Sequence, residues 1–286
     1  METWFRCRAE ETTAACEQAL EHLERTGQLH SHLANSIRSR LLVSYYFAPA
    51  HVDEAIERVR AVQHGSYGPI AEAWEGSVLG RLYALKGEIE RARELVRGGH
   101  EVFLGAGLLV SAKGMSMSEA EVEWRSGDFT AGERAMREAL ELLEKIGDRS
   151  YQPTVALDLA RHLYQLGRYD EVRPLCTRGR ELTGADDLVN FVFLEGLEGG
   201  LLAREGRYEE GEAHVRRALE LVETADFFEA RAWVRLMLAE TLSLAGRKAE
   251  AAELAAQGLS IREAKGDMAG AARDRVRLEE VGIAVV

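Results

Sequence analysis

The chain has 286 residues, of which 46% are hydrophobic and 29% charged, so it can bury a large core without disulfides or metals. Its 36 Lys and Arg against 48 Asp and Glu give a net charge of −12, opposite to the excess that nucleic-acid binding requires. No stretch approaches the roughly 20 apolar residues of a membrane span, and the first residues lack an export signal. We therefore expect a cytoplasmic protein with no nucleic-acid and no membrane partner.

The order of the predicted elements follows from the hydrophobic period and the turn signals. Apolar residues recur three and four positions apart throughout, and strand patterns are almost absent, so the sequence predicts an all-α protein. We predict a half repeat at residues 2–26, six helix pairs and a capping helix at 268–282, in one domain. The pairs span residues 28–64, 69–106, 108–147, 149–184, 186–225 and 227–266, with a break from Gly65 after the first pair.

Turn glycines mark an internal repeat. A glycine followed by Arg, Asp or Glu recurs every 39 or 40 residues, at Gly87, Gly127, Gly167, Gly206 and Gly246. Small residues such as Gly80 and Gly99 flank each turn at fixed distances, because two closely packed helices leave no room for larger ones. Two positions after the glycine, a ring or branched side chain is expected to plug the hairpin, at Ile89, Phe129, Tyr169 and Tyr208.

With Leu79-Gly80-x-x-Tyr83 in place, the chain resembles the tetratricopeptide repeat family, with a period of about 40 in place of 34. The resemblance implies a right-handed α-α superhelix, a quasi-one-dimensional stack in which the first helix of each pair lines a concave groove. The segment from Asp226 to Arg273 is similar to the C-terminal arm of actinobacterial signal-transduction ATPases, nucleotide cyclases and maltose-regulator-type proteins. Because the chain has no G-x-x-x-x-G-K-[ST] loop and no cyclase segment, neither activity is transferred.

The candidate binding residues are those on the inner face of the first helices. Positions 13, 10, 6 and 3 before the turn glycine share one helix face, and aromatic rings beside arginines are typical of binding hot spots. The predicted groove residues are Trp74, Arg81, Met117, Glu121, Trp124, Arg161, Tyr164, Phe193, Arg204, Trp233 and Glu240, joined by Arg40 and Phe47 from a degraded repeat. The alternative is that these rings pack between neighbouring helices.

These patterns favour a non-catalytic module that binds a peptide or protein segment in its groove, in a regulatory or scaffold role in bacterial signalling. A receptor for a small apolar metabolite or signalling peptide is the first alternative. The second is an enzyme that has recruited the groove, with Glu121, Glu240 and His162 as acids or bases. We expect no metal and no cofactor, since no ligand set shows metal spacing, and we expect His162 and His214 to be exposed.

Overall fold

The structure is a computed structural model that describes residues 2–62 and 68–284. Within these ranges the chain forms helices and contains no strand. The predicted break from Gly65 falls partly on residues 63–67, outside the described residues. The helices are α1 (Glu2–Phe5), α2 (Ala9–Arg25), α3 (His32–Phe47), α4 (Val52–Val62), α5 (Pro69–Leu85), α6 (Ile89–Gly105), α7 (Leu109–Ser126), α8 (Phe129–Ile146), α9 (Gln152–Gln165), α10 (Tyr169–Leu182), α11 (Leu188–Arg204), α12 (Tyr208–Glu223), α13 (Phe228–Leu244), α14 (Lys248–Lys265) and α15 (Met268–Glu280).

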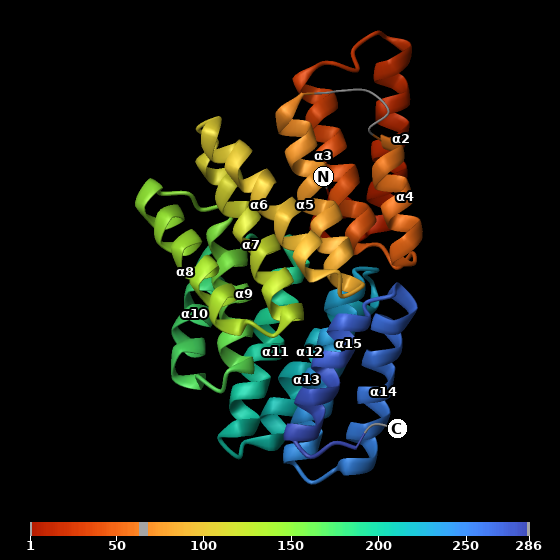
Figure 1. The fold of residues 1–286 in the computed structure, drawn as a ribbon. Helices are drawn as coiled ribbons and strands as arrows, with labels where there is room; N and C mark the ends of the chain where they lie inside the picture. Colours follow the sequence, from red (N-terminus) through yellow and green to blue (C-terminus); the bar gives the residue numbers. More distant parts are fainter. Residues whose placement is uncertain (1, 63–67, 285–286) are drawn as a thin grey trace.

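Consecutive helices run up and down and pack side by side (Figure 1). The turn glycines end the first helix of a pair with a left-handed backbone, as at Gly87 with φ 84° and Gly206 with φ 83°. Only glycine adopts this conformation at little cost, which explains why it recurs at this point of each repeat. No described helix is long and apolar enough to cross a bilayer.

Small residues bring the two helices of a pair into close contact, as the sequence predicts. A Cβ on Gly199 would lie 2.5 Å from Val215 Cγ2 and 2.6 Å from the carbonyl oxygen of Gly211. Tyr208 was expected to fill the space inside the same hairpin. This expectation was wrong, because the Tyr208 side chain is 41% exposed. Since α11 and α12 already touch backbone to backbone at these glycines, no space remains for a ring between them.

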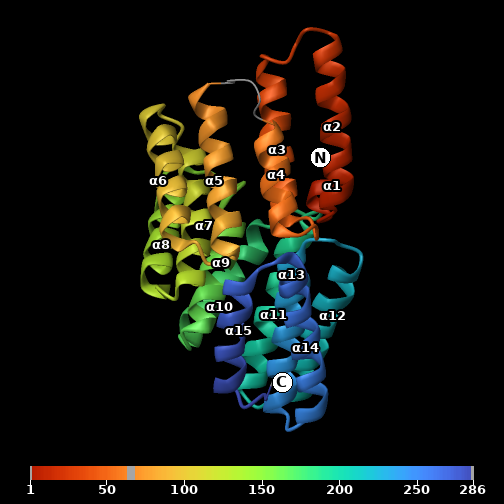
Figure 2. The same ribbon diagram turned by 45° about the vertical axis from the view of Figure 1, so that its right-hand side comes forward.

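The two ends of the array meet, which the expected one-dimensional stack does not include. Figures 1 and 2 show the last helices, in blue, beneath the first ones, in red and orange. At one contact, the Asp226 carboxylate before α13 accepts hydrogen bonds from the backbone amides of Ala9 (2.5 Å) and Glu10 (2.9 Å), the first residues of α2. Asp226 therefore caps a helix more than 200 positions earlier in the chain.

A second contact joins α14 and α15 to α3 and α7 through buried charges. Asp267 accepts two hydrogen bonds from the Arg125 guanidinium, at 3.0 and 3.1 Å, and neither side chain is exposed. Lys265 Nζ donates to the carbonyl oxygen of Ala48 at 2.6 Å, at the end of α3. Arg273 donates to the carbonyl oxygen of Ser126 at 2.6 Å, at the end of α7. The curvature of the array thus brings its last helices against α3, near its beginning, and against α7, in its middle.

Candidate functional site

A cavity of about 440 Å³ lies on the inner side of the array. Its described lining residues belong to α1, α3, α5, α7, α9, α11 and α13, and to the turns that lead into the last three of these helices. The predicted assignment of the groove to the first helix of each pair therefore agrees with the position of this cavity. The volume is in the range of roughly 300–1,000 Å³ that ligand pockets occupy.

The structure distributes the predicted groove residues over three places. Eight of them line the large cavity: Arg40, Phe47, Trp74, Arg81, Met117, Glu121, Arg161 and Phe193. Trp124 and Trp233 line a neighbouring cavity of about 30 Å³, which has room for a water molecule but not for a peptide. The remaining three, Tyr164, Arg204 and Glu240, line neither cavity.

Tyr164, Arg204 and Glu240 form a polar cluster between helices, so the prediction that they line the groove does not hold. Glu240 is buried and accepts hydrogen bonds from the Tyr164 hydroxyl at 3.0 Å and from Arg204. Tyr164 fits there because Gly200 has no side chain; a Cβ on this glycine would lie 2.6 Å from the Tyr164 hydroxyl oxygen. In the same way, a Cβ on Gly196 would lie 2.5 Å from the Trp233 ring. The side chains of Tyr164 and Trp233 thus fill the space that these glycines of α11 leave open.

Aromatic side chains form one wall of the large cavity. The rings of Phe47 and Phe227 are stacked with centroids 4.4 Å apart, and Trp4 lies edge-on to both, at 5.7 and 5.2 Å. Trp74 packs edge-on against Phe103 at 5.2 Å. Aromatic rings in edge-to-face or stacked pairs restrict one another's position. The cavity therefore has a rigid apolar wall.

Paired charges line the same cavity and lie against its rings: the guanidinium carbon of Arg81 is 4.9 Å from the Phe47 ring centroid, and that of Arg161 is 4.2 Å from the Phe193 ring centroid. Arg81 donates two hydrogen bonds to Glu121, at 2.8 and 2.6 Å, in a bidentate pair. Arg161 donates to Asp158 at 3.0 Å and to Glu229 at 3.2 Å. These pairs cancel most of their own charge, so a ligand meets hydrogen-bonding groups that already have partners.

The two carboxylates beside Arg161 differ in acidity. Burial raises the pKa of Asp158 to about 6, despite the attraction of Arg161. Burial would also raise the pKa of Glu229, but the positive charges of Arg161 and Arg125 outweigh it and lower the pKa to about 2. Glu229 is therefore the carboxylate that keeps its charge in mildly acidic solution.

The candidate acids and bases of the enzyme hypothesis are engaged by other parts of the chain. The ring nitrogens of His162 lie 2.8 Å from the Asp158 carbonyl oxygen and 3.4 Å from that of Ala120. The expectation that His162 is exposed was wrong, because the ring is buried where α9 packs on α7. Glu121 also accepts a hydrogen bond from the Tyr46 hydroxyl at 2.7 Å.

Sequence reasoning missed several lining residues. Trp4 and Phe5 lie in the predicted half repeat, and Phe227, Asp158 and Glu229 lie outside the four positions used to define the inner face. The sequence feature that could have indicated the aromatic lining residues is the presence of two adjacent aromatic pairs, Trp4-Phe5 and Phe227-Phe228, at predicted helix boundaries. Aromatic side chains at such exposed points are unusual unless another segment covers them.

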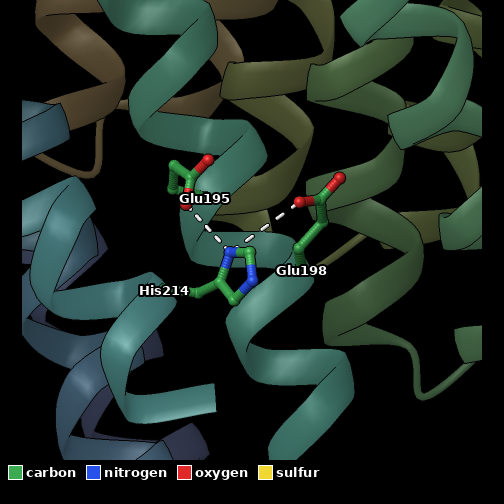
Figure 3. A group of neighbouring side chains, drawn as sticks. All are labelled: Glu195, Glu198 and His214. Atoms are coloured by element: carbon green, nitrogen blue, oxygen red, sulfur yellow. Dashed lines mark hydrogen bonds and ion pairs between the residues drawn. The ribbon is translucent and has the colours of Figure 1, made fainter. Parts of the chain in front are cut away.

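One side-chain group outside the cavity has donors suited to a cation. His214 Nδ1 lies 2.8 Å from Glu195 and 3.8 Å from Glu198, in the arrangement of Figure 3. Arginines already neutralise both carboxylates, since Arg217 lies 3.0 Å from Glu195 and Arg180 lies 2.7 Å from Glu198. The group is therefore an ion-pair network between α10, α11 and α12. His214 is half-buried in it, not exposed as expected.

Comparison with known proteins identifies the repeats. Residues 194–264 and residues 153–176 each match a tetratricopeptide repeat family. No curated protein matches the chain significantly. The two matched segments coincide with α9 and the start of α10, and with α11 to α14.

Several solved structures share the fold at low sequence identity. NprR in complex with its cognate peptide NprX is 15% identical, with a TM-score of 0.60, covering 96% of this chain and 84% of NprR. A Rap protein complexed with competence and sporulation factor is 11% identical, with a TM-score of 0.60, covering 96% and 87%. BtubC (BKLC) from P. vanneervenii is 17% identical, with a TM-score of 0.51, covering 74% and 89%. The predicted fold class is thus confirmed: the chain is an all-α solenoid with the fold of tetratricopeptide-repeat proteins, and residues 153–176 and 194–264 match models of that family.

Proposed function

We propose that the protein is a non-catalytic binding module that takes a peptide or protein segment into its 440 Å³ cavity, in a regulatory or scaffold role in bacterial signalling. The observation that carries the proposal is the cavity itself, whose wall combines a rigid set of rings with fixed charge pairs. Such a surface gives apolar anchors a pocket and gives polar groups defined partners.

The peptide-bound neighbours support the same function. NprR binds its cognate peptide NprX and the Rap protein binds competence and sporulation factor, and both structures match most of this chain. Their identity to this chain is low, so they support the class of ligand and not its sequence. The resemblance to arms of actinobacterial ATPases and cyclases stays a prediction.

Catalysis has less support. Glu121, Glu240 and His162, the three candidate acids and bases, all hold hydrogen bonds within the protein. A general base needs a free acceptor within reach of the substrate proton. A receptor for a small apolar molecule is the stronger alternative, because the cavity volume suits a drug-sized ligand as well as a short peptide.

A steric block gives the sharpest test of the cavity. Gly114 lines it, and a Cβ there would meet only the Tyr151 ring, at 3.7 Å. Gly114→Phe should therefore fill the cavity without removing a contact, and replacing a helical glycine favours the helix. The matched control is Gly98→Phe, on the exposed outer face of α6, where an added Cβ meets nothing within 4 Å.

The assay is selection from a phage-displayed library of random heptapeptides, followed by calorimetric titration of the selected peptides. We expect binding to the native protein, a loss of about 2 kcal/mol or more in Gly114→Phe, and no loss in Gly98→Phe. Equal binding to both variants, or no selected peptide, would overturn the proposal. A small molecule seen by native mass spectrometry on the native protein but not on Gly114→Phe would favour the receptor alternative.

A further inference from the structure

We propose that the Arg161 side chain closes the inner end of the large cavity and thereby sets how far an apolar group of the ligand can reach. This inference rests on the proposed function, because it concerns ligand binding in the same cavity. It adds a residue that determines the size of the group that the protein accepts. The small cavity of about 30 Å³ lies behind this residue, and the native protein keeps the ligand out of it.

The two cavities follow one another along the same helices. On α9, Thr154 lines only the large cavity, Arg161 lines both cavities, and Gln165 lines only the small one. On α7, the residues in the same order are Gly114, Glu121 and Trp124. Steps of three, four and seven residues return to one face of a helix, so each helix carries its lining side chains from one cavity into the next. The small cavity is therefore the continuation of the large one beyond a wall.

Side chains from three helices form this wall. The described residues that line both cavities belong to α7, α9 and α13, and they are Met117, Glu121, Asp158, Arg161 and Glu229. Asp158 and Glu229 are buried, whereas Phe5 and Tyr151, which line only the large cavity, are exposed. The wall therefore lies at the end of the large cavity that is far from solvent.

Arg161 is held in this wall by two hydrogen bonds and two rings. Its terminal nitrogens donate to Asp158 at 3.0 Å and to Glu229, on α13, at 3.2 Å. Its guanidinium carbon lies 4.2 Å from the ring centroid of Phe193 and 5.3 Å from that of Trp233. These contacts oppose the rotation of a long side chain that would otherwise occupy many rotamers. The side chain therefore keeps its place when a ligand enters.

The surface behind Arg161 would bind an apolar chain that reached it. Trp124, Trp233 and Met136 line the small cavity, which has room for one water molecule while Arg161 is in place. Each CH₂ group buried there would raise the affinity about fourfold. Arg161→Ala gives the space of the long side chain to both cavities and joins them. The size of residue 161 thus decides whether a ligand gains these contacts.

A series of uncharged 1-alkanols, from hexanol to dodecanol, measures the depth of the cavity. Each alkanol displaces the neutral fluorophore N-phenyl-1-naphthylamine, and the concentration for half displacement is compared. In the native protein this concentration should fall about fourfold per added CH₂ up to a cut-off length and then stop falling. In Arg161→Ala the cut-off should move to a chain about two or more CH₂ groups longer, because the residues from Arg161 to Gln165 cover about 6 Å of α9.

Two further variants separate the size of the side chain from its charge. Arg161→Lys keeps the charge and most of the length, so its cut-off should stay close to the native one. Arg161→Met loses the same charge as Arg161→Ala but has a longer side chain, so its cut-off should lie between the native one and that of Arg161→Ala. Equal cut-offs in Arg161→Met and Arg161→Ala would assign the effect to charge and overturn the proposal. A merely structural role of Arg161 would change stability and leave the cut-off length where it is.

The outcomes distinguish this inference from the proposed function. An Arg161→Ala cut-off equal to the native one, or a native affinity that keeps rising through dodecanol, overturns the role of Arg161 and leaves the proposed peptide binding intact. A fluorophore that fails to bind the native protein, or binds Gly114→Phe equally well, counts against both, because the cavity is then not the binding site. If Arg161→Ala does not fold, Arg161→Met compared with Arg161→Lys carries the test, with the longer cut-off expected in Arg161→Met.

Discussion

Neutralising Asp267 should release the contact that closes the array. Its carboxylate is fully buried and accepts hydrogen bonds from Arg125 at 3.0 and 3.1 Å, from Arg262 at 2.7 Å and from the Gly270 amide at 3.0 Å. Asp267→Asn keeps the shape and the capability to cap α15, but removes the negative charge between two buried guanidinium groups. Arg262 retains Asp274, whereas Arg125 loses both of its carboxylate hydrogen bonds and keeps only the more distant Glu121, at 3.9 Å.

The expected loss can be worked from this geometry. Removing one partner of a buried ion pair typically costs about 3 to 5 kcal/mol, because the remaining charge stays desolvated. This is a large part of the roughly 5 to 15 kcal/mol by which a domain is stable. Asp267→Ala should cost about 1 kcal/mol more, because it also removes the N-cap hydrogen bond to Gly270.

Urea unfolding followed by far-ultraviolet circular dichroism measures these losses from the midpoint and slope. Asp53→Asn is the matched control, since its partner Lys86 and Asp53 are both at the surface and the pair should contribute nothing measurable. Hydrogen exchange should rise first in α15, where the broken contact lies. If Asp267→Asn lowers the unfolding free energy by no more than Asp53→Asn does, the closing contact is not held by charge.

Three further changes probe the packing, the helix cap and a buried lysine. Gly80→Leu should lower the unfolding free energy by about 1 to 3 kcal/mol or more in a urea titration, because a Cβ there would lie 2.9 Å from the Ala92 carbonyl oxygen. Glu141→Leu, on the exposed face of α8, is the control and should change the unfolding free energy very little. Equal losses in the two variants would refute the predicted alignment of the repeats. Asp226→Ala should cost about 1 kcal/mol and raise hydrogen exchange at the start of α2, and protection there that stays native would contradict the capping contact. Burial lowers the pKa of Lys265 to about 7, against about 10.4 unfolded, so the unfolded state binds more protons between these values. The unfolding free energy of the native protein minus that of Lys265→Met should therefore rise with pH by up to about 1.4 kcal/mol per unit between pH 8 and 9, and a difference independent of pH would exclude this titration.

Local patterns were sufficient to predict the repeats and much of the cavity wall. A left-handed turn needs glycine, and a close helix pair needs small residues, so Gly87 and Gly80 mark positions that short-range sterics impose. Helical spacing also placed Trp74, Arg81, Glu121 and Phe193 on one face, and all four line the cavity. These predictions succeed because each depends on residues a few positions apart, or on the packing of one helix against the next.

The tertiary structure alone decided how far the groove stays open. Spacing tells which face of a helix is covered but not what covers it, so nothing local indicates that Trp233 fills the space beside Gly196. Closure depends on the curvature summed over the helices from α7 to α15, which brings Arg125 against Asp267, 142 positions along the chain. Long-range packing also brings Trp4 against Phe227 on the cavity wall, with ring centroids 5.2 Å apart. The cavity is therefore a property of the closed array, because no single repeat contains enough of its wall to define it.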